Sequence, residues 1–499
     1  MTKTSPRYDE PLPAAFFPDS APLPFARTDF GPAFHWGAAA AAYQTEGAWQ
    51  HQGKGPSIWD DFTRRKGVVR RNEHGRVAAD FYNRYESDLD LAHGLGLSDF
   101  RFSAAWARVL PGGTGAVNRR GLDFYDRLVD ACLERDLRPW LTLYHWDLPS
   151  ALQARGGWTN RGIVGWFPEY AQVMARRLGD RVAHWAVLNE PMVFVGAGHL
   201  LGVHAPGRRH LGAFLAAAHH ATLAQAEGGR ALRALLPDAA RIGTTFSCSY
   251  LTPQRPGNAY DAAATRRADA LLNRFFVEPA LGLGYPVADL PALRWLLERY
   301  QKPGDDLRVK FDFDFWGIQN YTREVVKFSP WLPLQWAALV PAKQRGVPYT
   351  DMGWEVYPES LYHMLKQFAA YPNAPQLIVT ESGSAFSDER RGPRVTDPAR
   401  RAYLQAAVGQ VLRARQEGVD VGGYFAWSLT DNFEWAEGYG PRFGLIHVDY
   451  DTQERTVKDS GRWYREFLGG ATLAAGPELA ARLPRGVGAP AASGAGLGS

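Results

Sequence analysis

Short apolar runs alternate with amphipathic segments along most of the chain. Aliphatic and aromatic residues gather in eight runs, which lie at 33–39, 99–103, 138–145, 183–190, 241–248, 313–320, 375–381 and 421–429. Between them lie segments whose apolar residues recur with helical spacing, for example 80–96, 121–136 and 167–180. Apolar runs of this length, bounded by helical segments, predict the strands of a parallel sheet.

The number of these strand and helix units favours one of two kinds of parallel sheet, a closed barrel or an open sheet. Eight strand and helix units are enough to close a barrel in which each strand is followed by a helix. We therefore predict an α/β fold made of a single (β/α)8 TIM barrel with extended βα loops. An open doubly wound sheet stays possible, because the pattern alone does not show whether the two edges of the sheet join.

The two ends of the chain differ in composition from the segment between them. Residues 1–30 are rich in proline and polar residues, which predicts an irregular N-terminal lead-in. Residues 469–499 are rich in alanine, glycine and proline and carry no charged side chain after Arg485, so we predict a disordered tail. The segment 31–468 contains no linker and no low-complexity break, and we assign it to one (β/α)8 domain.

Composition and charge exclude several classes of partner. The chain is 45% hydrophobic and 22% charged, and its formal net charge of +4 is small for 499 residues. Its short basic clusters also contain acids, so we expect solvated faces and no nucleic-acid partner. The longest apolar stretch, "FHWGAAAAAY", is too short to span a bilayer, and we expect no membrane partner.

The cysteines and the N-terminus indicate a compartment. Cys132 and Cys248 are too few for a disulfide framework and do not have the spacing of metal ligands. The N-terminal segment is interrupted by prolines and lacks the continuous apolar core of a secretion signal. We therefore expect a protein of the reducing cytoplasm that has no metal site.

Polar residues stand at the ends of the predicted strands. They are Arg101, His145, Trp146, Asn189, Glu190, Gln319, Asn320, Tyr321, Glu381 and Ser428. In a (β/α)8 barrel these strand ends open on one face, which carries the catalytic groups. Each residue alone also fits the start of a loop. Two glutamates that meet among aromatic rings, however, are what glycoside hydrolysis requires.

Ordered motifs make the prediction more specific. The stretches are "FHWGAAAAAYQTEGAW", "SIWDDF", "FRFSAAWARVLP", "LYHWDLPSAL", "GGWTNR", "VLNEPMV", "DMGWEVYPESL", "VTESG" and "WSLTDNFEWAEGYGPRFGL". With these motifs in this order, the sequence resembles the family-1 glycoside hydrolases, the β-glucosidase family, over roughly residues 30–468. A lone Asn-Glu-Pro would be a weak signal, whereas the full set is a strong one.

The resemblance implies a catalytic set. It makes Glu190 of "NEP" the general acid/base, with Asn189 beside it for the 2-hydroxyl of the sugar. It makes Glu381 of "TESG" the nucleophile, with Arg101 and Tyr321 holding its carboxylate ionised. A structural ion pair is a second reading of Arg101 that is compatible with the first.

The resemblance also implies a substrate-binding set and no cofactor. Residues that resemble those binding the hydroxyls of the non-reducing sugar are Gln44, His145, Trp146, Glu434 and Trp435, and Phe443 lies in the same motif as the last two. Trp427 would be the stacking platform, and Trp354 would line the aglycone site or serve only in packing. Proton transfer and covalent catalysis need only the two carboxylates, so we expect neither a metal nor an organic cofactor.

Two departures from the family pattern surround the predicted nucleophile. Ser382 stands where the family has an amide, and "GIQNYT" has Gln319 and Asn320 where Asn and Tyr are commoner. The predicted roles of Glu381 and Tyr321 are kept, while the local hydrogen bonding differs.

We therefore predict a retaining exo-β-glycosidase acting on unphosphorylated β-glucosides, with β-galactosides and β-fucosides as secondary substrates. The acid Glu434 would repel a phosphate on the sugar, which disfavours a 6-phospho-glycosidase. A transglycosidase that uses the same covalent intermediate is one alternative. A non-catalytic sugar-binding protein on the same fold is another. The sequence leaves the oligomeric state and the natural aglycone open.

Overall fold

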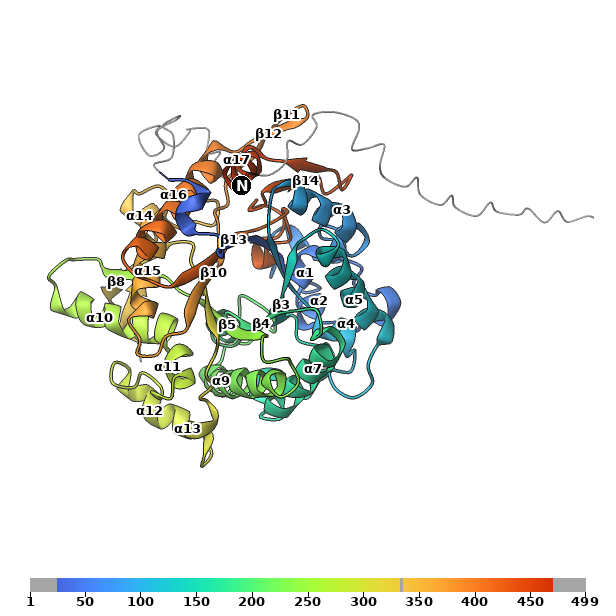
Figure 1. Cartoon of the computed structure of the whole chain (residues 1–499). Helices are drawn as coiled ribbons and strands as arrows, with labels where there is room; N and C mark the ends of the chain where they lie inside the picture. The colour runs from blue at the N-terminus through green and yellow to red at the C-terminus, as the bar shows by residue number, and fades with distance from the viewer. Residues whose placement is uncertain (1–24, 333–334, 470–499) are drawn as a thin grey trace, which may run out of the picture.

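The computed structural model describes residues 25–332 and 335–469 (Figure 1). The predicted lead-in as far as residue 24 and the predicted tail from residue 470 onward lie outside the described residues. Within them, eight parallel strands form a closed barrel in the order β1-β13-β10-β7-β5-β4-β3-β2. The first strand pairs with both β2 and β13, which closes the ring and excludes the open doubly wound sheet.

The barrel strands begin and end close to the predicted runs. They are β1 (His35–Ala39), β2 (Asp99–Ser103), β3 (Arg138–Tyr144), β4 (His184–Asn189), β5 (Arg241–Ser247), β7 (Phe315–Gln319), β10 (Gln376–Ser382) and β13 (Val421–Trp427). The predicted (β/α)8 TIM barrel is thus confirmed, and the strand ends differ from the prediction by at most two residues. Strand ends vary by this much because the pairing there gives way to loops.

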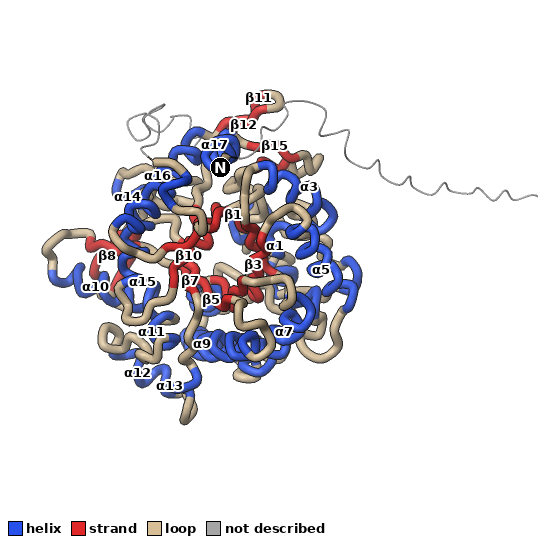
Figure 2. The backbone as a smooth tube through the Cα atoms, viewed as in Figure 1, coloured by secondary structure: helices blue, strands red, loops and turns tan. Residues whose placement is uncertain are grey.

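Helices surround the barrel, and Figure 2 shows them as an outer ring around the strands. Those that follow the strands in turn are α3 (Phe81–Gly94), α5 (Arg119–Leu133), α7 (Ile163–Leu178), α9 (Leu211–Arg233), α10 (Ala259–Asp269), α15 (Glu359–Ala369), α16 (Pro398–Gln416) and α17 (Asp459–Leu468). In α5, Phe124, Leu128 and Cys132 recur every four residues and are buried. This spacing places them on one face of the helix, which is why the segment packs on the barrel.

Side chains along each strand alternate between the inside of the barrel and the helices outside it. In β2, Phe100 and Phe102 belong to the main hydrophobic core, while Arg101 between them contacts Glu381 of β10. The two-residue period of a strand therefore places an arginine inside the barrel and phenylalanines against the helices.

An aromatic layer fills the barrel below the polar strand ends. Trp140, Phe315, Ile378 and Phe425 form a separate buried cluster, and the ring centroids of Trp140 and Phe425 lie 5.0 Å apart. A side chain on Gly37 would collide with the Phe425 ring, so glycine at this position makes room for the layer. The interior is therefore packed, and only its upper end is free to carry chemistry.

The βα loops carry additional short elements. They are the helices α1 (Ala42–Thr45), α2 (Ile58–Phe62), α4 (Trp106–Val109), α6 (Ser150–Ala154), α8 (Pro191–Val195), α11 (Val277–Ala280), α12 (Pro291–Glu298), α13 (Asp305–Arg308) and α14 (Ala342–Arg345). Small sheets are formed by β6 (Tyr250–Pro253), β8 (Arg323–Phe328) and β9 (Ala337–Leu339), by β11 (Glu389–Arg391) and β12 (Arg394–Thr396), and by β14 (Ile446–Val448) and β15 (Arg455–Val457). Among the described helices, none has the length and apolarity that crossing a bilayer requires.

Candidate active site

Two glutamates lie at the carboxyl ends of β4 and β10. Glu190 follows the last residue of β4, and Glu381 is the sixth residue of β10. The pairing register shifts at both places, between Ala186 and Asn189 on β4 and between Val379 and Glu381 on β10. Such irregularities re-aim side chains near active sites. Both carboxyl groups are buried, with 6% of Glu190 and 3% of Glu381 exposed.

Glu381 accepts hydrogen bonds from three different side chains. Arg101 Nη1 and Gln319 Nε2 donate to its Oε1 at 2.5 and 2.8 Å. Tyr321 Oη donates to its Oε2 at 2.7 Å. Burial raises the pKa of Glu381, while the charge of Arg101 and the bond from Tyr321 oppose that rise. Donors on both oxygens favour the ionised form of this carboxyl group.

Asn189, the last residue of β4, shares two hydrogen-bond donors with Glu381 of β10. Its Oδ1 accepts from Arg101 Nη2 at 2.6 Å, from Gln319 Nε2 at 2.8 Å and from Thr245 Oγ1 at 3.0 Å. Its Nδ2 lies 3.0 Å from His145 Nε2. Three donors on one oxygen fix the orientation of the amide, so Nδ2 donates to the histidine.

Glu190 has a different environment from Glu381. Burial raises its pKa well above the ordinary range, and the nearby charge of Glu381 raises it further. The backbone of Glu190 is left-handed, with φ at 46°, and Pro191 follows as the first residue of α8. A left-handed glutamate is uncommon and is found mainly where the surrounding structure enforces it. The pKa of Glu190 is thus raised well above the ordinary range, while that of Glu381 is raised less, because Arg101 and Tyr321 oppose the effect of burial.

A third buried glutamate lies in the loop after β13. Gln44 Nε2 donates to Asn432 Oδ1 at 2.9 Å, to the carbonyl of Phe433 at 3.0 Å and to Glu434 Oε2 at 3.3 Å. Burial and the charge of Glu381 raise the pKa of Glu434 to about 8, although Trp427 and Gln44 donate to it. The hydrogen bonds from Gln44 and the course of the loop together fix the position of the Glu434 side chain.

Several buried polar atoms at the site are left without a hydrogen-bond partner among the described residues. Two of them, His145 Nδ1 and Gln44 Oε1, lie on residues predicted to bind the sugar. Burial, followed by the charge of Arg101, lowers the pKa of His145 well below the ordinary value, so the ring is neutral. Because its Nε2 accepts from Asn189, Nδ1 carries the proton and donates. A buried donor and a buried acceptor of this kind suit a ligand hydroxyl, which can satisfy both.

Aromatic rings form the walls of the site. Trp427 and Phe443 belong to one small cluster, against which Tyr321 and Trp354 pack. Trp354 is half-buried, and its ring centroid lies 5.3 Å from that of Tyr321. On another side, Trp435 lies 5.9 Å from His145 between ring centroids. Flat apolar surfaces of this kind stack on the C–H faces of sugars.

Trp146 differs from the expectation in one respect. Its indole Nε1 already donates to the backbone carbonyl of Asn189 at 2.9 Å, so this N–H is engaged within the protein. The ring packs against Trp435, with centroids 4.6 Å apart. Trp146 therefore orients Asn189 and supports Trp435, and the hydrogen bond to a sugar hydroxyl that the resemblance implies does not fit this geometry.

The structure brings the predicted catalytic and sugar-binding residues together, and it adds two residues to which the sequence analysis assigned no catalytic or binding role. Gln319 bridges Glu381 and Asn189, and Asn432 holds Gln44 beside Glu434. The signal for Gln319 was present, since it is a polar residue at the end of a predicted strand. The signal for Asn432 was its place beside Glu434 in "TDNFEW".

Comparisons with known proteins identify the family of the chain. Residues 26–471 match the family model of glycosyl hydrolase family 1. Beta-glucosidase A of Thermotoga maritima is 43% identical over 88% of this chain and 97% of its own length. A beta-glucosidase of Agrobacterium sp. is 40% identical over 88% of this chain and 95% of its own.

Solved structures give the same result. A structure of the beta-glucosidase from Thermotoga maritima in complex with glucoimidazole has a TM-score of 0.85 at 43% identity, covering 88% of this chain and 99% of that chain. Another structure of that enzyme, in complex with galacto-hydroximolactam, has a TM-score of 0.84 at 42% identity, covering 88% and 98%. The family model matches nearly the whole chain and the solved relatives resemble its structure, so the chain belongs to glycosyl hydrolase family 1.

Proposed function

We propose that the protein is a retaining exo-β-glucosidase that hydrolyses terminal unphosphorylated β-D-glucosides. The observation that carries the proposal is the unequal environment of two buried glutamates in one site. Glu381 accepts three donors, whereas burial and the charge of Glu381 hold Glu190 towards its neutral form. Two carboxyl groups whose pKa values are pushed apart are suited to act as nucleophile and acid.

In the first step Glu381 acts as the nucleophile. An oxygen of its carboxylate forms a bond to the anomeric carbon as the glycosidic bond breaks, which gives a glycosyl ester. The carboxyl proton of Glu190 passes to the departing glycosidic oxygen, and the aglycone leaves as a neutral alcohol. Arg101, Gln319 and Tyr321 keep Glu381 ionised and aimed before attack.

In the second step Glu190 acts as the base. Esterification removes the charge of Glu381, and with it one of the causes that raise the pKa of Glu190. The Glu190 carboxylate accepts a proton from water as the water oxygen attacks the anomeric carbon. The ester bond breaks, Glu381 becomes an anion again, and the sugar leaves with its original configuration.

Recognition of the sugar rests on residues around the two carboxyl groups. Gln44 Oε1 and His145 Nδ1 are the unpartnered acceptor and donor for one hydroxyl, and Glu434 serves the 4- and 6-hydroxyls. Asn189 serves the 2-hydroxyl, and Trp427 is the stacking platform. Trp435 and Phe443 complete the wall around the sugar, and Trp354 lies towards the aglycone. β-Galactosides and β-fucosides follow as secondary substrates.

One finer proposal concerns the compartment, and two alternatives to hydrolysis are distinguished by experiment. The described cysteines, Cys132 and Cys248, are both free and buried, which supports a reducing cytoplasm as the site of action. Transfer of the sugar to an alcohol instead of water uses the same intermediate, and analysis of products with added acceptor distinguishes it. A non-catalytic sugar-binding role predicts binding without turnover of any aryl β-glycoside.

Trapping the intermediate tests the nucleophile. An activated 2-deoxy-2-fluoro-β-glucoside destabilises the oxocarbenium-like transition states of both steps, while its good leaving group keeps the first step faster. We expect the ester to accumulate and peptide mapping to find the added mass on the peptide containing "VTESG". Glu381→Ala should abolish labelling and turnover, and azide should restore turnover with an α-glycosyl azide as product. Label on any other carboxylate would show that the nucleophile is misplaced.

The pH dependence tests the acid. Activity requires Glu190 protonated, so kcat/KM should fall as the pH rises through its raised pKa. It requires Glu381 ionised, so kcat/KM should also fall as the pH drops through the pKa of that group. Glu190→Gln should lower kcat about 10²- to 10⁴-fold on a substrate with a poor leaving group and remove the alkaline limb. An unchanged alkaline limb in this variant would count against the assignment.

A further inference from the structure

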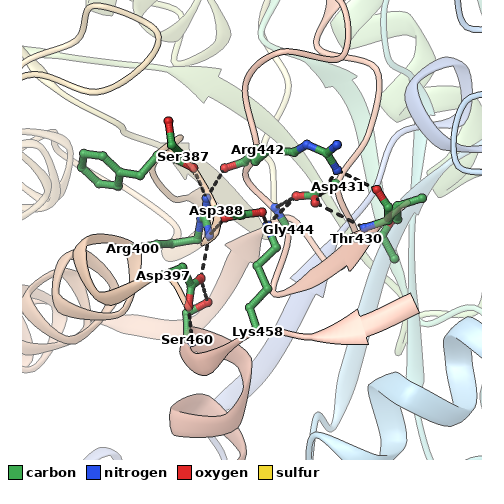
Figure 3. Close-up of polar contacts among 12 residues, drawn as sticks. Ser387, Asp388, Asp397, Arg400, Thr430, Asp431, Arg442, Gly444, Lys458 and Ser460 are labelled. Carbon is green, nitrogen blue, oxygen red and sulfur yellow. Dashed lines mark hydrogen bonds and ion pairs between the residues drawn. The ribbon is translucent and has the colours of Figure 1, made fainter. Parts of the chain in front are cut away.

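A buried ionic network lies beside the active site and joins three parts of the chain (Figure 3). Its carboxylates are Asp388, Asp397 and Asp431, and its cations are Arg400, Arg442 and Lys458. Asp388, Asp397 and Arg400 lie between the end of β10 and the first turn of α16, Asp431 and Arg442 lie in the loop that follows β13, and Lys458 directly precedes α17. Three carboxylates thus face three cations. The side chains of these residues are buried, except that of Arg442, which is partly exposed.

Lys458 is the central cation of the network. Its side chain is fully buried, and its Nζ lies 2.7 Å from Asp388 Oδ2 and 2.7 Å from Asp431 Oδ1. Its backbone N–H donates to the carbonyl of Leu445 at 3.0 Å. One ammonium group therefore links the loop after the nucleophile strand to the loop that carries Glu434.

Arg400 makes a second link between the same two loops. Its guanidinium donates to the backbone carbonyls of Ser384 at 3.2 Å, Phe386 at 2.6 Å and Arg442 at 2.5 Å. It also donates to Asp388 at 2.7 Å. Ser384 follows Glu381 by three residues, so the hydrogen bonds from Arg400 begin close to the proposed nucleophile in the chain.

Asp431 connects the network to the sugar-binding loop. Its Oδ1 accepts from the backbone N–H of Gly444 at 2.9 Å, and its Oδ2 accepts from Arg442 Nη1 at 2.9 Å. The next residue, Asn432, accepts from Gln44, which donates to Glu434. A shift of Asp431 would therefore move the group that holds Glu434.

A metal ion does not fit between Asp388 and Asp431, where the ammonium group of Lys458 lies. Asp388, Asp431 and His447 each offer one ligand atom within 4.8 Å of the others. Lys458 Nζ, however, already lies at hydrogen-bond distance from both carboxylates, and the charges of Arg400 and Arg442 are added to it. The ammonium group therefore takes the place that a cation would fill.

We propose that Lys458, with Arg400 and Arg442, is a positioning residue that fixes the loop after β13 against the nucleophile strand and thereby sets recognition of the 4- and 6-hydroxyls. The inference rests on the proposed function, in which Glu434 binds these hydroxyls. None of the three cations touches the reacting atoms. Their effect is exerted through Asp431 and Asn432 on Gln44 and Glu434, so their loss should alter selectivity for hydroxyls more than the chemical step.

The test compares aryl β-D-glucoside with its 4-deoxy and 6-deoxy analogues. In Lys458→Met, the preference in kcat/KM for the glucoside over the deoxy analogues should fall about tenfold, because even a displacement of about 1 Å costs up to 10²-fold when positioning matters. Active sites are counted with the 2-deoxy-2-fluoro reagent, so that loss of folded protein does not enter the ratio. Arg394→Met is the matched control, since Arg394 pairs on the surface with Asp459, the neighbour of Lys458.

Arg442→Gln is a milder variant that keeps Lys458 in place. Arg442 is partly exposed, so this variant should fold even if Lys458→Met does not, and it should shift the same preference about threefold. An equal loss of kcat/KM on all three substrates in either folded variant would overturn the positioning role and leave only a structural one. Absence of turnover by the wild type would instead overturn the proposed function.

Discussion

At the scale of single residues, the site depends on which donors reach which carboxyl group. Gln319 and Arg101 each donate to both Glu381 and Asn189, so these two residues are held by shared donors. Shared donors couple the position of the proposed nucleophile, Glu381, to that of the Asn189 amide. Substitution of either donor should therefore affect catalysis and binding together.

We predict the effect of Gln319→Leu on this arrangement. Loss of a hydrogen bond to a charged group costs about 1.5–3 kcal/mol, so kcat/KM should fall roughly 10- to 150-fold. Because a donor to the ionised form is lost, the pKa of Glu381 should rise and the acidic limb of the pH profile should move to higher pH. The measurement is kcat/KM as a function of pH.

Gln319→Asn is the matched control, since it keeps the amide on a side chain shorter by one methylene. It should lose less activity than Gln319→Leu. If the acidic limb of the pH profile were the same in Gln319→Leu as in the wild type, the hydrogen bond from Gln319 would not influence the pKa of Glu381.

The sequence points to candidate catalytic residues but not to all of their contacts. Glu190, Glu381 and Glu434 stand in motifs whose residue types require their chemistry. The bond from Gln319 to Glu381 depends on the register shift between β7 and β10, which pairs these two residues. A register of this kind is set by contacts across the sheet, and no local pattern in the sequence encodes it.

At the scale of elements, the strands were predictable because each is an apolar run of the right length between helical segments. The small sheets of the loops were not, since β9, β11, β12, β14 and β15 have only three residues each. Their pairing depends on loops meeting in the fold. The same holds for Asn432, whose contact with Gln44 joins the two ends of the barrel sequence.

Phe425→Ala tests the aromatic layer inside the barrel. Phe425 is fully buried and contacts Trp140, so its truncation should reduce the free energy of unfolding by about 3–5 kcal/mol. The layer lies below the polar strand ends, so kcat per titrated active site should change little. Urea unfolding and active-site titration measure the two quantities. A large loss of kcat with unchanged stability would contradict the separation of the two layers.

At the scale of the whole molecule, buried ion pairs join distant parts of the chain. A count of eight strands predicted a barrel, although only the pairing of β1 with both β2 and β13 shows that the ring closes, and the network around Lys458 did not follow from the sequence. Its members lie between residues 388 and 458, where each one alone looks like a solvated turn or helix residue. Only the fold shows that they are buried together.

This network should make stability depend on pH. Burial favours the neutral form of Asp431, but the charges of Lys458, Arg442 and Arg400 outweigh burial and lower its pKa to about 2. An unfolded aspartate titrates near pH ~3.9. The folded pKa is the lower one, so the contribution of Asp431 to stability is present above about pH 4 and is lost as the pH falls towards 2.

We expect the free energy of unfolding of the wild type to decrease from pH 5 to pH 2. Asp431→Asn should be less stable at pH 5, because Lys458 then lacks one of its two carboxylates. It should also lose less stability than the wild type on acidification, since one of the titrating groups is gone. Urea unfolding at several pH values measures both. Parallel curves for the two proteins would contradict a lowered pKa of Asp431.

The strand order of the barrel also bears on how such a protein diversifies. Strand β10, which carries Glu381, and strand β4, which Glu190 directly follows, are separated in the ring by β5 and β7. The radius of a closed barrel is fixed by its strand number and shear, so exchange of surface loops leaves the distance between these strands unchanged. Grafts that replace 323–350 should therefore yield new leaving-group preferences while the stereochemistry at the anomeric carbon is inherited intact. Selection is thus free to vary one property without risking the other.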